Sequence, residues 1–419
     1  MNISLRAQGL KSSATVAVMN RAAEMKRQGI EVLPFAAGEP DFDTPQLIKQ
    51  AAIDAMLAGQ TKYAPTPGDA VTRKVISDKL TRENGLPNCT PDHVVISAGN
   101  KNSLYLVFQA LIDPPHPSRF GGAQAEMILP VPAWVSFAPI CELAGGKVVP
   151  VETTQASDFK MTPAQLEAAI TPRSRVLLLN SPSNPCGTMY SPDELAALCA
   201  VVERAVKTIA PELVIVSDEM YEKIIYGGLK HYSPGSFPGV AERTITCNGL
   251  SKAYAMTGWR IGYCAGSGEF GLQVAKAVTK LQTQVTTCIP QFFLPAIRVA
   301  LTQCDADVER MRVAFAQRGE LISGLMRDVP NMPFPRPTGG FFLFCDVSAH
   351  LGKSTPKGVK IDVPAKFSEA LLDDHHMATV SGEDFGGCGR THVRLSFACS
   401  DDQIREGVKR LGTFVRSLR

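Results

Sequence analysis

Along most of the chain, helical patterns alternate with short apolar runs. Apolar runs of roughly four to eight residues, bounded by polar or small residues, are typical of strands buried on both faces of a parallel sheet. Five such runs occur, at residues 93–97, 126–129, 175–180, 213–217 and 244–247. Helical patterns separate them, so the sequence predicts an α/β fold with a largely parallel sheet.

The helices between these runs have clear starts and ends. Thr44 can cap a helix that has Pro45 in its first turn and Gly59 just past its end. Thr162–Gln165 and Ser191–Glu194 have the form of capping boxes, in which side chains satisfy backbone N–H groups at the helix start. The first helix is expected to bury an apolar stripe of Leu47, Ile48, Ala51, Ala52 and Met56.

The length of the chain indicates two domains, because 419 residues exceed what one compact core usually accommodates. In its last third the pattern changes to a long amphipathic helix at 305–329 and a strand at 340–345. We therefore predict a large domain at 45–297 and a small C-terminal domain at 298–419. Residues 1–44 are predicted to form an N-terminal arm and part of the small domain.

Composition argues against several classes of function. The formal charge is 43 − 40 = +3 without a basic run, so no nucleic-acid or membrane-surface role is expected. Eleven cysteines without a CxxC pair are typical of reduced thiols, and no metal site is expected. Without a signal peptide or an apolar run of about 18 residues, the protein is expected in the cytoplasm. Surface loops rich in Pro and Gly are expected at 113–124 and 351–360.

Polar residues follow the predicted strands, where ligands gather in an open α/β sheet. Lys252 lies among small and apolar residues after the run 244–247. Desolvation favours its neutral amine, which can attack an aldehyde. Arg260, eight residues later (252 to 260), is a permanent cation suited to a phosphate. Asp218 follows the run 213–217 and needs a cationic partner, such as a protonated ring nitrogen, if it is buried.

Other strand ends carry residues that can hydrogen-bond or stack. Tyr221 and Asn184 can donate to a ring oxygen, and Asn184 is rigidly presented because a proline follows it. Trp134 can stack on a flat heteroaromatic ring. Gly99–Lys101 lies between a strand and a helix, where backbone N–H groups can cradle an anion. Arg394, in a segment that alternates like a strand, can bind a carboxylate in bidentate fashion.

Each of these residues alone also fits a structural role. The lysine can lie on the surface, the arginines can be ion-paired, and the aspartate can cap a helix. The asparagine can belong to a plain turn, and the tryptophan can pack in the core. The functional interpretation therefore depends on their order and spacing.

Taken together, the sequence resembles class I aminotransferases of fold type I, with its closest match to the bacterial aspartate/prephenate aminotransferase branch. Asn184, Asp218 and Lys252 follow one another at intervals of 34 residues (184 to 218, 218 to 252). The resemblance extends over about residues 4 to 415. Four further segments carry it: Ser13–Val18, Ala37–Pro45, Thr61–Pro65 and Met256–Tyr263.

The resemblance implies a large domain, whose mixed and mostly parallel sheet lies between helices, and a smaller α+β domain. It implies pyridoxal 5′-phosphate as the cofactor. Lys252 would hold the cofactor as a Schiff base and would then move the proton at the substrate Cα. Asp218 would pair with the ring nitrogen, Tyr221 and Asn184 would hold the ring oxygen, and Trp134 would stack on the ring.

The resemblance also implies two sets of binding residues. The phosphate would be held by Gly99, Asn100, Lys101, Arg260 and Tyr63. The substrate would be held by Gly38, Lys101, Trp134, Asn184 and Arg394. Tyr63 would reach the phosphate in a neighbouring subunit, which implies a homodimer with shared active sites. Arg394 and the backbone of Gly38 would hold the α-carboxylate, and Lys101 would meet the distal carboxylate of a dicarboxylic substrate.

Three positions depart from the family pattern. Gly249 stands where many relatives have a serine that contacts the phosphate. Cys186 stands where threonine is usual, and Asn100 stands where the branch usually has a second glycine. The backbone at Asn100 is therefore expected to lose some conformational freedom.

The expected activity is transfer of the amino group of L-aspartate or glutamate, through the cofactor, to an oxoacid such as 2-oxoglutarate. Prephenate is a further candidate acceptor. Alanine or aromatic amino acids as substrates, and a β-lyase or decarboxylase on the same fold, remain alternatives. A non-catalytic regulatory protein derived from this fold is the least favoured alternative, because Lys252 is present.

Overall fold

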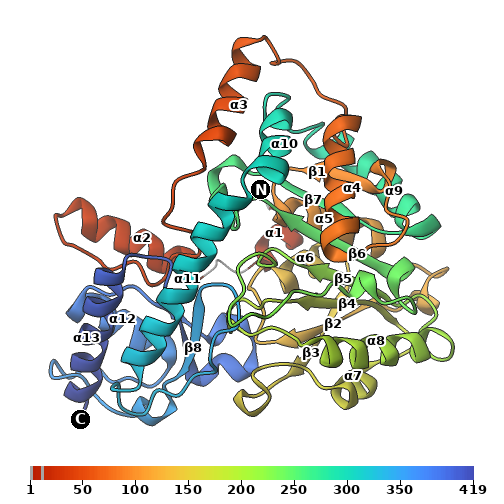
Figure 1. Cartoon of the computed structure of the whole chain (residues 1–419). Coiled ribbons are helices and arrows are strands. Elements are labelled where there is room, and N and C mark those ends of the chain that lie inside the picture. The colour runs from red at the N-terminus through yellow and green to blue at the C-terminus, as the bar shows by residue number, and fades with distance from the viewer. Residues whose placement is uncertain (1–2, 11–13) are drawn as a thin grey trace.

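The computed structural model describes residues 3–10 and 14–419 and contains two β-sheets with helices around them (Figure 1). The larger sheet has seven strands in the order β1-β7-β6-β5-β4-β2-β3. Its strands are β1 (Val94–Ser97), β2 (Glu126–Val131), β3 (Lys147–Glu152), β4 (Ser174–Asn180), β5 (Val214–Asp218), β6 (Thr244–Gly249) and β7 (Gly262–Ala265). β7 runs antiparallel to β1 and β6, and the other adjacent pairs are parallel. The predicted α/β class with a mostly parallel sheet is confirmed.

Helices cover both faces of the larger sheet, which explains why its strands read as apolar runs. Along β4, Val176 and Leu178 pack in one core with α5, α6 and α9, whereas Leu177 and Leu179 pack in another with α7 and α8. The helices are α1 (Leu5–Gly9), α2 (Ala14–Arg27), α3 (Gln46–Leu57), α4 (Ala70–Asn84), α5 (Asn100–Leu111), α6 (Phe137–Leu143), α7 (Pro163–Ala169), α8 (Pro192–Val206), α9 (Gly268–Val285), α10 (Phe293–Gln303), α11 (Asp305–Met326), α12 (Pro364–His375) and α13 (Asp401–Ser417).

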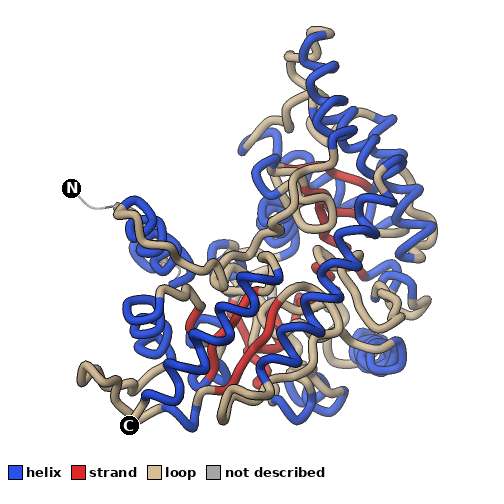
Figure 2. Tube along the Cα trace, turned by 60° about the vertical axis from the view of Figure 1, so that its left-hand side comes forward, coloured by secondary structure: helices blue, strands red, loops and turns tan. Residues whose placement is uncertain are grey.

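The smaller sheet is antiparallel, with the strand order β8-β10-β9. Its strands are β8 (Phe342–Asp346), β9 (Val380–Ser381) and β10 (His392–Ser396). Helices α11, α12 and α13 lie around it (Figures 1 and 2). The N-terminal segment joins this part of the molecule, since Leu33 bridges to Met377 and Phe35 is buried in the same core. The boundaries at 44/45 and 297/298 remain predictions, and Ser13 lies outside the described residues.

The predicted helix starts are confirmed at two places and wrong at a third. The capping boxes at Thr162 and Ser191 are present at the starts of α7 and α8. Thr44 does not cap α3, which begins at Gln46 without a side-chain cap. The Thr44 hydroxyl instead donates to the Ala255 carbonyl at 2.7 Å and accepts from Trp259 Nε1 at 3.2 Å. These tertiary hydrogen bonds outcompete the local cap.

The predicted apolar stripe of α3 is also only partly buried. Ile48 and Ala52 are buried, but Leu47 and Met56 are 51% and 48% exposed. The apolar side chains on this helix therefore lie partly on the surface. Among the residues that the structure describes, no helix combines the length and apolarity needed to cross a bilayer.

Candidate active site

A cavity of about 420 Å³ opens where the larger sheet meets β10 and the N-terminal segment. Strands β1, β2, β4, β5 and β6 run in one direction, so their carboxyl ends lie at the same edge of the sheet. Most of the predicted site residues line this cavity: Gly38, Asn100, Lys101, Trp134, Asn184, Asp218, Tyr221, Lys252, Arg260 and Arg394. Gly99 lies directly behind Arg260. Tyr63 is 85% exposed and lies outside the cavity.

Asp218 is a buried carboxylate at the end of β5. Its Oδ1 accepts hydrogen bonds from Asn100 Nδ2 at 2.9 Å and from the Met220 backbone N–H at 3.2 Å. Burial raises the pKa of Asp218 to about 7, although these two hydrogen bonds oppose the rise. A carboxylate held in this way favours a cationic group in the cavity.

Lys252 follows β6 and directs its amine into the cavity, where Nζ donates a hydrogen bond to the Gly38 carbonyl. Burial lowers the pKa of Lys252 to about 8, and the nearby Glu39 carboxylate partly opposes this effect. The amine is therefore easier to deprotonate than that of an exposed lysine. Gly249, three residues earlier, has no room for a side chain, because a Cβ there would lie 2.7 Å from the Ile261 carbonyl oxygen.

Arg394 is a buried guanidinium on β10, with only 3% of the residue exposed. It donates to Asn184 Oδ1 and to the Ala36 carbonyl, each at 3.0 Å, while its Nε has no hydrogen-bond partner. Burial lowers the pKa of Arg394 to about 10. No carboxylate among the described residues pairs with this cation, so its surroundings favour an anionic ligand.

The first turn of α5 and Arg260 form a second cationic region. Gly99 has φ of 91°, and a Cβ there would lie 2.5 Å from Arg260 Nη2. Gly262 of β7 also allows close packing against this turn, since a Cβ at Gly262 would lie 2.3 Å from the Asn100 backbone nitrogen. Helix N-termini favour anions, and here two side-chain cations, Arg260 and Lys101, line the same cavity. This region is therefore suited to a phosphate.

Lys101 lies over the Trp134 ring, with Nζ 4.8 Å from the ring centroid. Burial lowers the pKa of Lys101, and the charge of Arg260 adds to this effect. Trp134 is half-buried and contacts Phe137 edge to face, with the ring centroids 5.3 Å apart. The lysine thus adds a positive charge beside the indole on the cavity wall.

Tyr221 lines the cavity, and 5% of the residue is exposed. Burial raises the pKa of the Tyr221 hydroxyl, while Arg394 and a hydrogen bond with Asn184 oppose the rise. Asn184 itself follows β4 and is fixed by Arg394 and by a backbone hydrogen bond to Asn180 Oδ1 at 3.0 Å. The structure therefore brings Tyr221, Asn184 and Arg394 together.

Several residues that line the cavity were not predicted from the sequence. Glu39 accepts a hydrogen bond from Thr257 Oγ1 at 2.9 Å, and both residues line the cavity. Met19 and Phe385 add apolar surface from α2 and from the segment before β10. Glu39 and Thr257 lie in two of the segments that carry the family resemblance, so they could have been predicted. No sequence pattern pointed to Met19 or Phe385. The bond from the Asn100 side chain to Asp218 was also missed.

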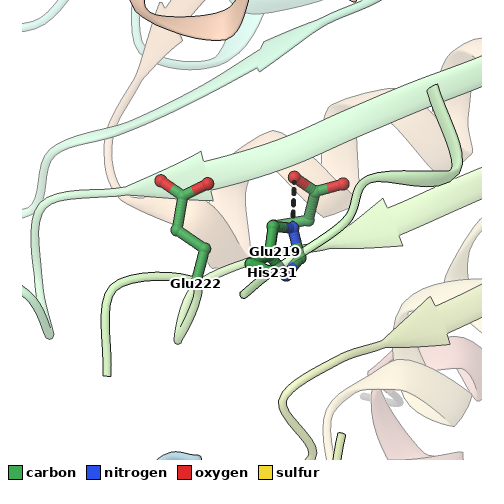
Figure 3. Close-up of side chains that lie close together, drawn as sticks. All are labelled: Glu219, Glu222 and His231. Atoms are coloured by element: carbon green, nitrogen blue, oxygen red, sulfur yellow. Dashed lines mark ion pairs between the residues drawn. The ribbon is translucent and has the colours of Figure 1, made fainter. Parts of the chain in front are cut away.

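A cluster of titratable side chains, Glu219, Glu222 and His231, begins directly after Asp218 in the chain (Figure 3). Glu219 Oε2 accepts from Asn84 at 2.6 Å and lies 3.1 Å from His231 Nε2, and Glu219 Oε1 accepts from Ser233 at 2.6 Å. One oxygen or nitrogen atom from each of Glu219, Glu222 and His231 lies within 4.8 Å of those of the other two. Lys79, 1% exposed, donates to Glu222. The ammonium of Lys79 therefore already neutralises one carboxylate of this cluster.

Replacing Lys79 with methionine is expected to destabilise the protein by about 3–5 kcal/mol, because it leaves Glu222 buried without a cation. The midpoint of chemical denaturation measures this loss. The matched control is Lys223→Met, which removes an ion pair with the partly exposed Glu83 and is expected to cost at most about 1 kcal/mol. Similar losses in both variants would contradict a specific role for the buried pair.

The cavity thus combines a buried amine, a buried carboxylate and several cations, an arrangement suited to a small anionic molecule. Residues 30–411 match the sequence profile of the family "Aminotransferase class I and II". An aspartate/prephenate aminotransferase from Cereibacter sphaeroides is 39% identical over 410 residues, covering 98% of this chain and 97% of that protein. An aspartate aminotransferase from Geobacillus stearothermophilus is 38% identical and covers both chains fully.

Solved structures that superpose on this chain are also named as aspartate aminotransferases. The aspartate aminotransferase of Rhizobium meliloti superposes with a TM-score of 0.91 at 36% identity, covering 100% of both chains. That of Thermus thermophilus, solved with maleate, has a TM-score of 0.87 at 37% identity and covers 99% of this chain and 100% of its own. The chain belongs to the class I and II aminotransferases.

Proposed function

We propose that the protein is a pyridoxal-phosphate-dependent aminotransferase that uses L-aspartate or glutamate as amino donor. One observation carries the proposal: a single cavity holds the Lys252 amine together with a buried carboxylate, Asp218, and the cationic region at Arg260. The names of the relatives support the choice of aspartate. Names that include prephenate support prephenate as an acceptor besides 2-oxoglutarate.

The residues present fit pyridoxal phosphate. Asp218 is suited to a protonated ring nitrogen, the region of Gly99, Asn100, Lys101 and Arg260 to the phosphate, and Trp134 to the ring face. Tyr221 and Asn184 are close enough to one another to hold the ring oxygen together. When bound, the cofactor would supply a carbonyl that combines with amines and a ring that accepts electron density.

The protein's own groups have distinct tasks in this proposal. Arg394, with the backbone of Gly38, holds the substrate α-carboxylate and so orients the Cα–H bond. Lys252 Nζ would take the proton from the substrate Cα and deliver it to the former carbonyl carbon of the cofactor, which its pKa of about 8 favours near neutral pH. Asp218 keeps the ring nitrogen protonated by its negative charge.

An absorbance spectrum tests the proposal directly. The purified protein, supplied with pyridoxal phosphate, is expected to show the visible band of a lysine-bound cofactor, and L-aspartate alone is expected to convert the band to that of the amino form. Addition of 2-oxoglutarate should restore the first band. A protein that never acquires the band would refute the cofactor assignment, whereas a band unchanged by aspartate would refute only the donor.

Lys101 is proposed to bind the distal carboxylate of aspartate. Its partly buried ammonium lines the cavity, and the Thermus thermophilus relative was solved with maleate, a dicarboxylate. Lys101→Ala is expected to lower kcat/KM for L-aspartate about 100-fold, because a desolvated carboxylate would lose its cation. For L-alanine the loss is expected to stay within about threefold. Steady-state assays at saturating cofactor measure both, and equal losses would disprove the assignment.

We also propose a homodimer in which Tyr63 contributes to the active site of the partner subunit. The exposed position of Tyr63 outside its own cavity and the exposed apolar side chains Leu47, Met56 and Leu57 on α3 support this assembly. A cytoplasmic location is part of the same proposal. The eleven free cysteines, nine of them buried, are typical of proteins in a reducing compartment.

A further inference from the structure

The side chain of Asn100 makes a contact that the proposed function does not yet use. Asn100 is the first residue of α5 and is 7% exposed. Its Nδ2 donates to Asp218 Oδ1 at 2.9 Å, across a sequence separation of 118 residues. Hydrogen bonds to a buried charged group are stronger than those between neutral groups. The Asn100 amide therefore has a larger effect on Asp218 than a surface contact would have.

The two donors to Asp218 act on the same oxygen. Asn100 Nδ2 and the Met220 backbone N–H both point at Oδ1, and no described residue donates to Oδ2. Because Asp218 lines the cavity, Oδ2 is the oxygen left to meet a ligand there. The two hydrogen bonds thus fix the rotation of the carboxylate and leave one oxygen free for the cavity.

The backbone holds Asn100 in place. The chain at Gly99 and Asn100 packs directly on Gly262 of β7, where a Cβ would lie 2.3 Å from the Asn100 nitrogen. In this position the other amide atom, Asn100 Oδ1, is buried and has no hydrogen-bond partner. A buried acceptor without a partner destabilises the folded protein. The orientation of the amide is therefore explained by its bond to Asp218 and not by a gain in local stability.

We propose that Asn100 is a positioning residue, which holds Asp218 ionised and turned so that Oδ2 faces the ring nitrogen of pyridoxal phosphate. The proposal rests on the proposed function. The resembling branch usually has a glycine at this place, so this chain adds a contact that a glycine cannot make. The charged residues that act on Asp218 itself, Glu219 and Lys252, are unchanged by substitutions at Asn100.

Two substitutions remove the donor, one by deleting the side chain and one while keeping its size. Asn100→Gly deletes the side chain, and Asn100→Leu keeps nearly the same shape without an N–H group. Asn102→Gly is the matched control, because it removes an asparagine side chain from the same turn of α5 without touching Asp218. Circular dichroism establishes that each variant is folded. Agreement between the glycine and leucine variants identifies the lost donor, rather than lost packing, as the cause.

The first measurement uses the protein without cofactor. The carboxyl stretch of Asp218, assigned by its loss in Asp218→Asn, is followed by infrared difference spectroscopy against pH. The midpoint of its protonation is expected to rise by about one pH unit in both Asn100 variants and to stay unchanged in Asn102→Gly. Unchanged midpoints in folded Asn100 variants would overturn the proposal. Because this measurement needs no cofactor, it remains decisive even if the proposed function fails.

The second measurement uses pyridoxal phosphate labelled with ¹⁵N in the ring. The ¹⁵N chemical shift reports whether the ring nitrogen is protonated, and titration gives the dissociation constant. Both Asn100 variants are expected to bind the cofactor about tenfold more weakly and to lose ring protonation at lower pH than the wild type. A wild-type protein that binds no label would refute the proposed function. Wild-type behaviour in both variants would refute the role of Asn100.

Discussion

Replacing Lys252 with alanine is expected to lower the turnover of aspartate by at least about 10⁴-fold, the upper range for a lost acid/base group. The reason is that Lys252 Nζ alone among the described lysines combines a position next to Gly38 in the cavity with a strongly depressed pKa. Lys252→Arg should fail similarly, because a guanidinium stays protonated and cannot act as a nucleophile. Single-turnover and steady-state assays with L-aspartate measure the loss.

The control for this variant is Lys276→Ala, which removes an exposed lysine on α9 and should leave turnover within about twofold of the wild type. Lys252→Ala should still bind pyridoxal phosphate, since the phosphate region is intact. Reduction with borohydride before denaturation should attach the cofactor covalently to the wild type but not to this variant. A Lys252→Ala protein with more than a few per cent of wild-type turnover would refute the catalytic assignment.

The pH dependence of cofactor capture follows from the same residue. The Lys252 amine is protonated below its pKa of about 8 and neutral above it. Only the neutral amine attacks a carbonyl, so the rate of covalent capture should rise between pH 7 and 9 and then level off. The same lysine in an exposed setting would titrate near its ordinary pKa and would give a rise at higher pH.

The fold was predictable from the sequence where a single physical signal dominated. The runs that became β4, β5 and β6 are buried on both faces, so their continuous apolar character was informative. β3 and β7 were not predicted. β3 lies at the sheet edge, has one buried residue among its six and contains Pro150, and β7 has only four residues. Edge exposure and short length both weaken the periodic signal.

The candidate site was predictable to the level of residues but not of contacts. Strand ends located Asp218 and Lys252 because parallel strands present them at one edge. The Asn100–Asp218 hydrogen bond and the network of Glu219, Glu222 and Lys79 join residues more than 100 positions apart, which no local pattern encodes. The role of Tyr63 concerns a second subunit, so it stays a prediction.

Replacing Asp218 with asparagine is expected to lower turnover about 10³-fold, because the ring nitrogen would lose the charge that keeps it protonated. Asp218→Glu keeps the charge but misplaces it, so an intermediate loss is expected. The lysine-bound cofactor band should persist in Asp218→Asn, since Lys252 is intact. Spectroscopy and single-turnover kinetics together separate this loss of electron withdrawal from a loss of binding.

The same substitution should stabilise the cofactor-free protein. Asp218 has a pKa of about 7 in the folded state against an ordinary value of 3.8, so the folded state binds the proton more tightly than the unfolded state. The penalty for ionising the buried carboxylate therefore grows as pH rises from about 4 and is complete above about 7.

Asp218→Asn removes that penalty. The gain in unfolding free energy should be near zero at pH 4 and on the order of 4 kcal/mol at pH 8, measured by denaturant titration at both values. The control is Asp92→Asn, an exposed carboxylate next to Arg73, for which no gain is expected at pH 8. A gain of the same size at both pH values would contradict this explanation. Packing at residue 218, and not the buried charge of the carboxylate that we pair with the ring nitrogen, would then account for the change in stability.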